Sequence, residues 1–266
     1  MFRPGNPGYW VHPEWETQFP WLIQGTTGWS GDEIGDDLPR NFGLFTEPPA
    51  PDASEAWESL CRHLGFPRIV HARQIHGRAV SIHGEVASFQ AGDAGVLLPR
   101  GESRLRVGPD VDGHITKAEG ILLGVTVADC VPVFLVDPKA RAVGLLHAGW
   151  RGTVDSILEQ GIESLRREMG TDPKTLHLHL GPAICGGCYE VGPEVHAALG
   201  LPESPGPSPV DLRGQLAHRA VVLGVETERI TQSTWCTLCD GSPFFSHRRG
   251  DLERQAGFLG ISSRWE

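Results

Sequence analysis

The stretch GILLGVTVADCVPVFLVDPKARAVGLLHAGW (residues 120–150) consists of three apolar runs separated by short polar breaks. Asp137-Pro138 and the Lys-Ala-Arg that follows separate the second run from the third, and this combination predicts a turn. Continuous runs of Val, Leu and Ile of this length are typical of strands that are buried on both faces. The stretch therefore predicts three strands that other parts of the fold cover on both sides.

Helical and strand patterns alternate along the rest of the chain. Apolar spacing predicts helices over residues 55–64, over residues 153–169, and from Leu212 to about Leu223. We find no internal repeat and no long linker, so we expect an α+β fold in which a single catalytic domain has mixed β-sheet layers flanked by helices. This domain is expected to span residues 25–266, after an irregular N-terminal arm of residues 1–24.

The composition is that of an ordinary globular protein, with 39% hydrophobic and 21% charged residues. The formal net charge of -10 repels phosphate backbones and anionic lipids, so we expect neither nucleic acid nor a membrane as a partner. No run approaches the ~18 consecutive apolar residues of a membrane helix, and the start of the chain lacks the features of a signal peptide. We therefore expect a cytoplasmic protein whose six cysteines are thiols or metal ligands. The sequence leaves the oligomeric state open.

Three reactive side chains lie where a predicted strand runs into a loop: His76 in RQIHG, Cys130 in TVADCVPV and His147 in LLHAGWRGT. Two imidazoles and one thiolate suit Zn²⁺, and three protein ligands with an open fourth position are typical of a catalytic zinc site. Such a metal lowers the pKa of a bound water to ~7. Without a metal, the same residues are two hydrogen-bonded core histidines and a small apolar cysteine. The spacing alone does not decide between these alternatives.

The segments RQIHG, TVADCVPVFLVDP, GLLHAGWRGTVDSIL, LGPAICGGCYEVGPEV, WCT and FFSHRR occur in this order along the chain. In this order they resemble the laccase-like family first named multicopper polyphenol oxidase, of the YfiH or YlmD type, from about Gly25 to Ile261. Members of that family are described as purine nucleoside phosphorylases with adenosine deaminase activity. The resemblance implies that His76, Cys130 and His147 are both the catalytic residues and the metal ligands.

The resemblance further implies a zinc-dependent enzyme whose partners are purine nucleosides and phosphate. Adenosine and inosine are the expected substrates, with S-methyl-5′-thioadenosine as a further candidate. In phosphorolysis, phosphate attacks C1′ and releases the base and ribose 1-phosphate. In deamination, a zinc-activated water attacks C6 of adenine, and Asp129 is a candidate for moving the protons. Copper is the weaker candidate for the metal, because one His-x-His unit, at His177 and His179, does not make a laccase-type copper cluster.

Three further residues are weaker candidates for binding substrate or phosphate. Asn41 fits the L-N-L-G segment found near the start of family members. Arg151 lies at a predicted helix start, where a guanidinium beside free amide groups suits phosphate, and a structural salt bridge is an equal alternative. Arg249 and its neighbour Arg248 follow two phenylalanines in a loop, where paired arginines suit both base and phosphate, and a structural salt bridge is again an equal alternative.

Two CxxC pairs, Cys185 with Cys188 and Cys236 with Cys239, have the internal spacing of structural zinc sites. The 47 residues between the pairs exceed the usual spacing of a zinc ribbon, so the sequence favours four cysteines without a metal. For His177 and His179 we expect a solvated strand face. We expect the other histidines, such as His12, His63, His114, His196 and His218, at the surface or on helix faces.

Two other classes of function stay open at this point. The first is a Cys-dependent hydrolase or amidase, in which Cys130 is the nucleophile and His147 or His76 is the base. The second is a non-catalytic, metal-containing binding module. Metal content and turnover of a nucleoside panel distinguish the three.

Overall fold

The computed structural model describes residues 8–29, 41–84 and 103–263. In it the three apolar runs form the strands β7 (Ile121–Val127), β8 (Val131–Asp137) and β9 (Ala142–Ala148), with nearly every residue buried. β7 belongs to one sheet, whereas β8 and β9 pair with each other in a second sheet. The chain therefore passes from one sheet to the other at residues 128–130.

Each of the two sheets has six strands and mixes parallel with antiparallel pairs. The first sheet has the order β1 (Tyr9–Trp10), β2 (Leu22–Thr27), β14 (Gln255–Ile261), β7, β3 (Arg68–Ala72) and β5 (Leu105–Gly108). The second has the order β13 (Ile230–Gln232), β10 (His177–Leu180), β8, β9, β6 (Gly113–Thr116) and β4 (Val80–His83). A separate two-stranded ribbon consists of β11 (Glu190–Val191) and β12 (Ser208–Pro209).

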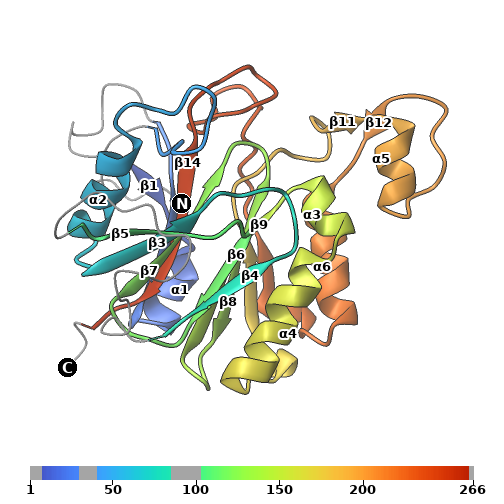
Figure 1. Ribbon diagram of the computed structural model, residues 1–266. Helices are drawn as coiled ribbons and strands as arrows, with labels where there is room; N and C mark the ends of the chain where they lie inside the picture. The colour runs from blue at the N-terminus through green and yellow to red at the C-terminus, as the bar shows by residue number, and fades with distance from the viewer. Residues whose placement is uncertain (1–7, 30–40, 85–102, 264–266) are drawn as a thin grey trace.

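Helices cover the outer face of each sheet, so the molecule has four layers (Figure 1). Helix α2 (Ala53–His63) lies on the first sheet, and α4 (Ile157–Met169) and α6 (Leu212–Val222) lie on the second. The shorter helices are α1 (Pro13–Gln18), α3 (Trp150–Val154) and α5 (Pro193–Ala198), with single 3-10 turns at Pro173–Thr175 and Thr227–Arg229. Within the described ranges, no helix has both the length and the apolar character needed to span a membrane.

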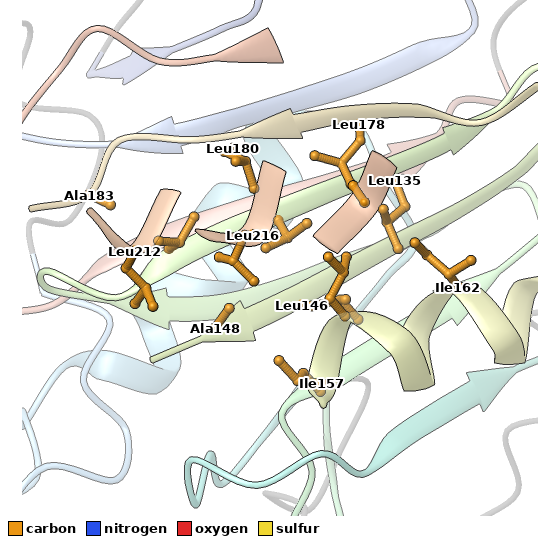
Figure 2. Packing of buried hydrophobic residues seen from close by; sticks show 14 of the residues in the cluster. Leu135, Leu146, Ala148, Ile157, Ile162, Leu178, Leu180, Ala183, Leu212 and Leu216 are labelled. Atoms are coloured by element: carbon orange, nitrogen blue, oxygen red, sulfur yellow. The ribbon is translucent and has the colours of Figure 1, made fainter. Parts of the chain in front are cut away.

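Neighbouring side chains of β9 belong to different parts of the core. Leu146 packs with Ile162 of α4 and Leu216 of α6, in the layer between the second sheet and its helices (Figure 2). Leu145 packs in the layer between the two sheets, together with Val125 of β7. Because both faces of these strands are covered, their sequences are apolar throughout rather than alternating. The predicted α+β fold of mixed sheet layers flanked by helices is confirmed.

The expectation of an irregular arm is wrong for residues 8–24, and residues 1–7 lie outside the described ranges. Strand β1, helix α1 and the first residues of β2 occupy this segment. Trp15 and Phe19 are buried in the layer between the sheets, and this burial holds a helix of six residues that is too short to show a period. The helix predicted over residues 153–169 also differs, because Ser156, with a φ of 70°, separates α3 from α4.

The expectation of a solvated face at His177 and His179 is also wrong. Both imidazoles lie on one face of β10, but aromatic rings cover them. The ring centroid of Phe19 is 4.9 Å from that of His177, and the centroid of Trp15 is 5.9 Å from that of His179. Among the histidines expected at the surface or on helix faces, His12 and His114 are buried, and His196 lies on helix α5 but is buried as well. His63 and His218 are exposed, as expected. Internal hydrogen bonds, such as that between His179 Nδ1 and Thr231 Oγ1 at 2.9 Å, make this burial tolerable.

The buried histidines lead to a prediction about stability in mild acid. Burial lowers the pKa of His71 and of His83 to about 4, and it lowers those of His114 and His179 well below their ordinary value. In the unfolded chain these histidines bind protons near pH ~6.5. The contribution of these histidines to the free energy of unfolding should therefore be complete above that pH. It should fall as the pH drops toward ~4, by up to ~1.4 kcal/mol per pH unit for each histidine. Urea unfolding curves across this range measure the effect.

Two variants make the test specific. His71→Gln removes one of the titrating groups and should make the pH dependence shallower. His218→Gln, at an exposed position of α6, should leave it unchanged. Equal free energies of unfolding at neutral pH and in mild acid would contradict the prediction.

Candidate functional site

The strand register of the second sheet brings the predicted site residues to one edge. His147 lies near the end of β9, opposite Pro132 of β8, so Cys130 at the start of β8 lies at the same edge. His76 lies in the loop between β3 and β4. The ligating atoms of His76, Cys130 and His147 all lie within 4.8 Å of one another. The distance from His76 Nε2 to Cys130 Sγ is 3.9 Å, and the two imidazole centroids are 4.9 Å apart.

The Asp112 carboxylate, which the sequence analysis did not single out, holds two of these three residues. It is fully buried directly before β6, whose pairing with β9 places it beside His147. Its Oδ1 accepts hydrogen bonds from His147 Nδ1 at 2.8 Å and from the backbone N–H of His76 at 2.9 Å. Its Oδ2 accepts from the N–H groups of Gly77 at 2.8 Å and of Ile75 at 3.1 Å. The proton on His147 Nδ1 leaves Nε2 as the free ligand atom, the usual arrangement behind a metal-binding histidine.

Two residues beside these side chains have a strained backbone. His76 has a φ of 60° and Asp129, next to Cys130, has a φ of 86°. A left-handed conformation in a residue other than glycine costs roughly 1–3 kcal/mol and persists only where its surroundings enforce it. For His76 the enforcing contacts are the three consecutive N–H groups that bind Asp112. Because a buried carboxylate enforces this strain beside reactive side chains, the loop at His76 is a candidate functional site.

Both carboxylate oxygens of Asp129 are used inside the protein. Oδ1 accepts from Thr237 Oγ1 at 2.6 Å, and Oδ2 accepts from the N–H of Arg248 at 2.8 Å. Its carbonyl oxygen accepts from the N–H of Ile184 at 3.1 Å. Asp129 therefore connects three loops around Cys130, a structural task that does not suit the proton-transfer role expected from the sequence.

The glycines of the HAGWRG segment, Gly149 and Gly152, lie where the chain has no room for a side chain. A Cβ on Gly149 would lie 2.9 Å from His76 Cδ2, closer than real Cβ contacts allow, and 3.0 Å from Cys130 Sγ, which is a tight contact. A Cβ on Gly152 would lie 3.0 Å from the carbonyl oxygen of Gly77. The turn from β9 into α3 therefore passes close to the site only because it carries no side chain at these two positions.

Electrostatics favour the thiolate form of Cys130. Burial raises the pKa of the thiol, but the adjacent His147 and His76 imidazoles outweigh burial and bring it to about 6. Burial lowers the pKa of His147, but the Cys130 thiolate and the Asp112 carboxylate outweigh it and raise the value to about 9. A thiolate beside two imidazole nitrogens fits Zn²⁺, which binds sulfur and nitrogen ligands. His76 is exposed, so this side of the group is open to solvent.

The three weaker candidates lie in different environments. Asn41 Oδ1 accepts from the N–H groups of Gly43 and of Arg254, so this amide connects a loop to the start of β14. Arg249 donates to two backbone carbonyls and to Asp251. Arg249 also lines a cavity of 590 Å³ to which none of the three site residues contributes. Both side chains are therefore engaged in holding the fold.

Arg151 is exposed, and its guanidinium lies 4.6 Å from the centre of the Trp150 ring. It has no ion pair within residues 8–29, 41–84 and 103–263, so the alternative of a structural salt bridge finds no support there. Arg254 is a second cation near the site: burial lowers its pKa, and the charges of Asp129 and Cys130 oppose that shift. Burial raises the pKa of Tyr189 to about 12, and the charge of Cys130 is the second cause of this shift. Tyr189 is therefore also close to Cys130. Tyr189 lies in the segment LGPAICGGCYEVGPEV that the resemblance rests on, but the sequence alone gives neither Tyr189 nor Arg254 a role at the site.

The role of Asp112 can be tested with Asp112→Asn. This change removes the charge that fixes the His147 tautomer and the strained loop at His76, so the affinity for zinc should fall roughly 10- to 100-fold. Asp110→Asn is the matched control, because Asp110 lies two residues before Asp112 but is exposed and forms an ion pair with Arg73. Zinc affinity is measured by competition with a chromogenic chelator. Equal affinity in both variants would show that Asp112 does not position the ligands.

The chain resembles characterised proteins over nearly its whole length. It is 32% identical over 255 residues to the purine nucleoside phosphorylase YlmD of Geobacillus stearothermophilus, covering 90% of each chain. It is 33% identical over 258 residues to the adenosine deaminase RL5 of an unknown prokaryotic organism, covering 90% of this chain and 89% of that one.

A solved structure has the same fold. The hypothetical protein YfiH of Bacillus licheniformis superposes with a TM-score of 0.80 at 26% identity, covering 98% of this chain and 99% of that chain. Residues 39–262 match the family model described as multi-copper polyphenol oxidoreductase laccase. By this match and by its relatives, the chain belongs to the multi-copper polyphenol oxidoreductase laccase family, as the resemblance of its motifs implied.

Proposed function

We propose that this protein is a zinc-dependent purine nucleoside phosphorylase that also deaminates adenosine. Its substrates are adenosine and inosine, with S-methyl-5′-thioadenosine as a further candidate. The observation that carries the proposal is the convergence of His76, Cys130 and His147 on one open site. Two relatives of this chain are named for these two activities, and the alignment covers about nine-tenths of each of them. The six unpaired cysteines suit the reducing cytoplasm, where we place the enzyme.

Phosphorolysis breaks the bond from C1′ to the base nitrogen and forms a bond from C1′ to a phosphate oxygen. The electron pair of the broken bond leaves with the base. The site must therefore hold an anion beside the sugar and stabilise negative charge on the base. We assign the anion first to Arg151, which is exposed and lies four residues after His147, and second to Arg254, whose pKa is affected by the charge of Cys130 and whose Nη1 already donates to two backbone carbonyls. A guanidinium binds phosphate oxygens in pairs.

The residues of the trio have separate tasks in the proposed reactions. His147 donates a hydrogen bond from Nδ1 to the Asp112 carboxylate and directs Nε2 into the site. His76 is exposed, so substrate can reach the trio from its side; its Nε2 faces the Cys130 sulfur, and its Nδ1 stays available for moving a proton. A zinc ion bound by the trio would supply a Lewis acid and lower the pKa of bound water. Deamination uses water in place of phosphate at the same site and releases ammonia from C6 of adenine.

One observation favours a second candidate function. Cys130, His147 and Asp112 follow one another as a nucleophile, a base and a carboxylate that orients the base, which is the arrangement of Cys-dependent hydrolases. The lowered pKa of Cys130 suits a nucleophile as well as a metal ligand. A non-catalytic binding module remains the third candidate.

A nucleoside panel tests the proposed reactions on zinc-loaded protein. Inosine should yield hypoxanthine and ribose 1-phosphate only when phosphate is present, whereas adenosine should yield inosine and ammonia without it. Arg151→Ala should raise the KM for phosphate roughly 10- to 100-fold, because a charged hydrogen bond is lost, and should spare deamination. Arg167→Ala, at an exposed position of α4, is the matched control. If zinc-loaded protein turns over no nucleoside, the binding module becomes the better assignment.

Alkylation of Cys130 separates the zinc enzyme from the Cys-dependent hydrolase. A thiolate bound to zinc shares its charge with the metal, so it should react slowly with iodoacetamide, and faster once a chelator has removed the metal. Mass spectrometry follows the labelling while nucleoside turnover is measured in the same samples. Rapid labelling of fully metal-loaded protein at neutral pH would refute the zinc enzyme and support the hydrolase.

A further inference from the structure

The two CxxC pairs, far apart in sequence, meet in the structure. Strands β10 and β13 are parallel neighbours, with Leu180 opposite Gln232, so the loops that follow them leave the same end of the sheet. Cys185 and Cys236 begin the CxxC pairs of these two loops. The loops continue side by side, because Ala183 forms a β-bridge with Cys236 and its carbonyl oxygen accepts from the N–H of Thr237. The 47 intervening residues therefore do not separate the pairs, contrary to the argument from ribbon spacing.

The four sulfur atoms have the spacing of a tetrahedral metal site. The Sγ atoms of Cys185, Cys188, Cys236 and Cys239 all lie within 4.8 Å of one another. The Sγ of Cys239 is 3.6 Å from that of Cys188 and 4.0 Å from that of Cys185. Four sulfurs bound at ~2.3 Å around a tetrahedral zinc ion lie ~3.8 Å from each other. The observed distances are close to this value and well beyond the ~2.05 Å of a disulfide bond.

Backbone groups around the cluster are arranged as around thiolates. Cys236 Sγ accepts from the N–H of Cys185 at 3.2 Å, across the two loops, and from the N–H of Leu238 at 3.4 Å, two residues further along. Donors of this kind orient and stabilise metal-bound sulfur. The buried guanidinium of Arg213 donates to the carbonyl oxygen of Trp235, the residue before Cys236, and so places positive charge beside the sulfurs.

We propose that Cys185, Cys188, Cys236 and Cys239 bind one structural Zn²⁺ ion as four thiolate ligands. Four protein ligands leave no position for substrate, in contrast to the three-ligand site at Cys130. The ion ties together the two loops that also hold Asp129, through the N–H of Ile184 and the hydroxyl of Thr237. The zinc-thiolate cluster is thus a clamp on the loops beside Cys130, and it does not depend on the reaction proposed for that site.

Zinc analysis of purified protein, combined with two sets of variants, tests the clamp. The double variant Cys188→Ser with Cys239→Ser should lose one zinc per chain relative to the wild type and unfold at a lower temperature. Cys61→Ser, which changes the buried cysteine outside both groups, should keep the full zinc content. Cys130→Ser reports on the other site. If the double variant loses zinc and Cys130→Ser does not, the structural zinc site is supported although the proposed zinc site at Cys130 is not. The experiment therefore tests the two zinc sites independently.

A second measurement on wild-type protein applies even if the double variant does not fold. Zinc release is followed with a metallochromic dye while a mercurial reagent titrates the thiols. The clamp requires release of one zinc as the four cluster cysteines react, with the modified residues identified by mass spectrometry. Full zinc content in the folded double variant would overturn the proposal. Disulfide-bonded cluster cysteines in freshly purified, metal-containing protein would also overturn it.

Discussion

The Asp112 carboxylate is a buried charge with four hydrogen bonds, and the geometry of the site follows from the need to satisfy it. Removing one partner from a buried charge is costly, so the groups that bind it are held firmly in place. Those groups come from the loop before β4 and from the end of β9, which β6 brings next to Asp112. The left-handed backbone of His76 and the tautomer of His147 are consequences of this single arrangement.

Asp129 has a similar task on the other side of Cys130. Its hydrogen bonds bind the loops that contain Ile184, Thr237 and Arg248 at the point where the chain crosses between the sheets. Asp112 thus fixes the His147 imidazole and the His76 backbone, while Asp129 fixes the loops around Cys130. The proposed zinc clamp continues this second set of contacts, since its cysteines belong to two of the same loops.

The charge distribution suits a small anionic substrate rather than a polyanion. The chain carries a formal net charge of -10, which disfavours nucleic acid. Near the site, however, Arg151 and Arg254 supply local positive charge, and Arg248 lies 5.1 Å from the centre of the Tyr189 ring. A phosphate ion can be attracted over this short range even where the whole surface repels anions, because salt screens the distant charges.

The sequence by itself determined the centre of the fold and the chemistry of the trio. The apolar runs of β7, β8 and β9 require cover on both faces, and a reactive side chain follows β7 at Cys130 and ends β9 at His147. These properties are local, because burial and strand length are visible in consecutive residues. Family motifs then selected His76 as the third member, which spacing alone could not do.

Only the tertiary structure decided which distant residues meet. Asp112 lies in a polar stretch without a period, and its role depends on the register of β6 against β9. The two CxxC pairs meet because β10 and β13 are parallel neighbours, which residue counting between them could not reveal. Trp15 and Phe19 order a six-residue helix through burial between the sheets rather than through helical periodicity. In each case the deciding interaction joins residues far apart in the chain, so no local pattern records it.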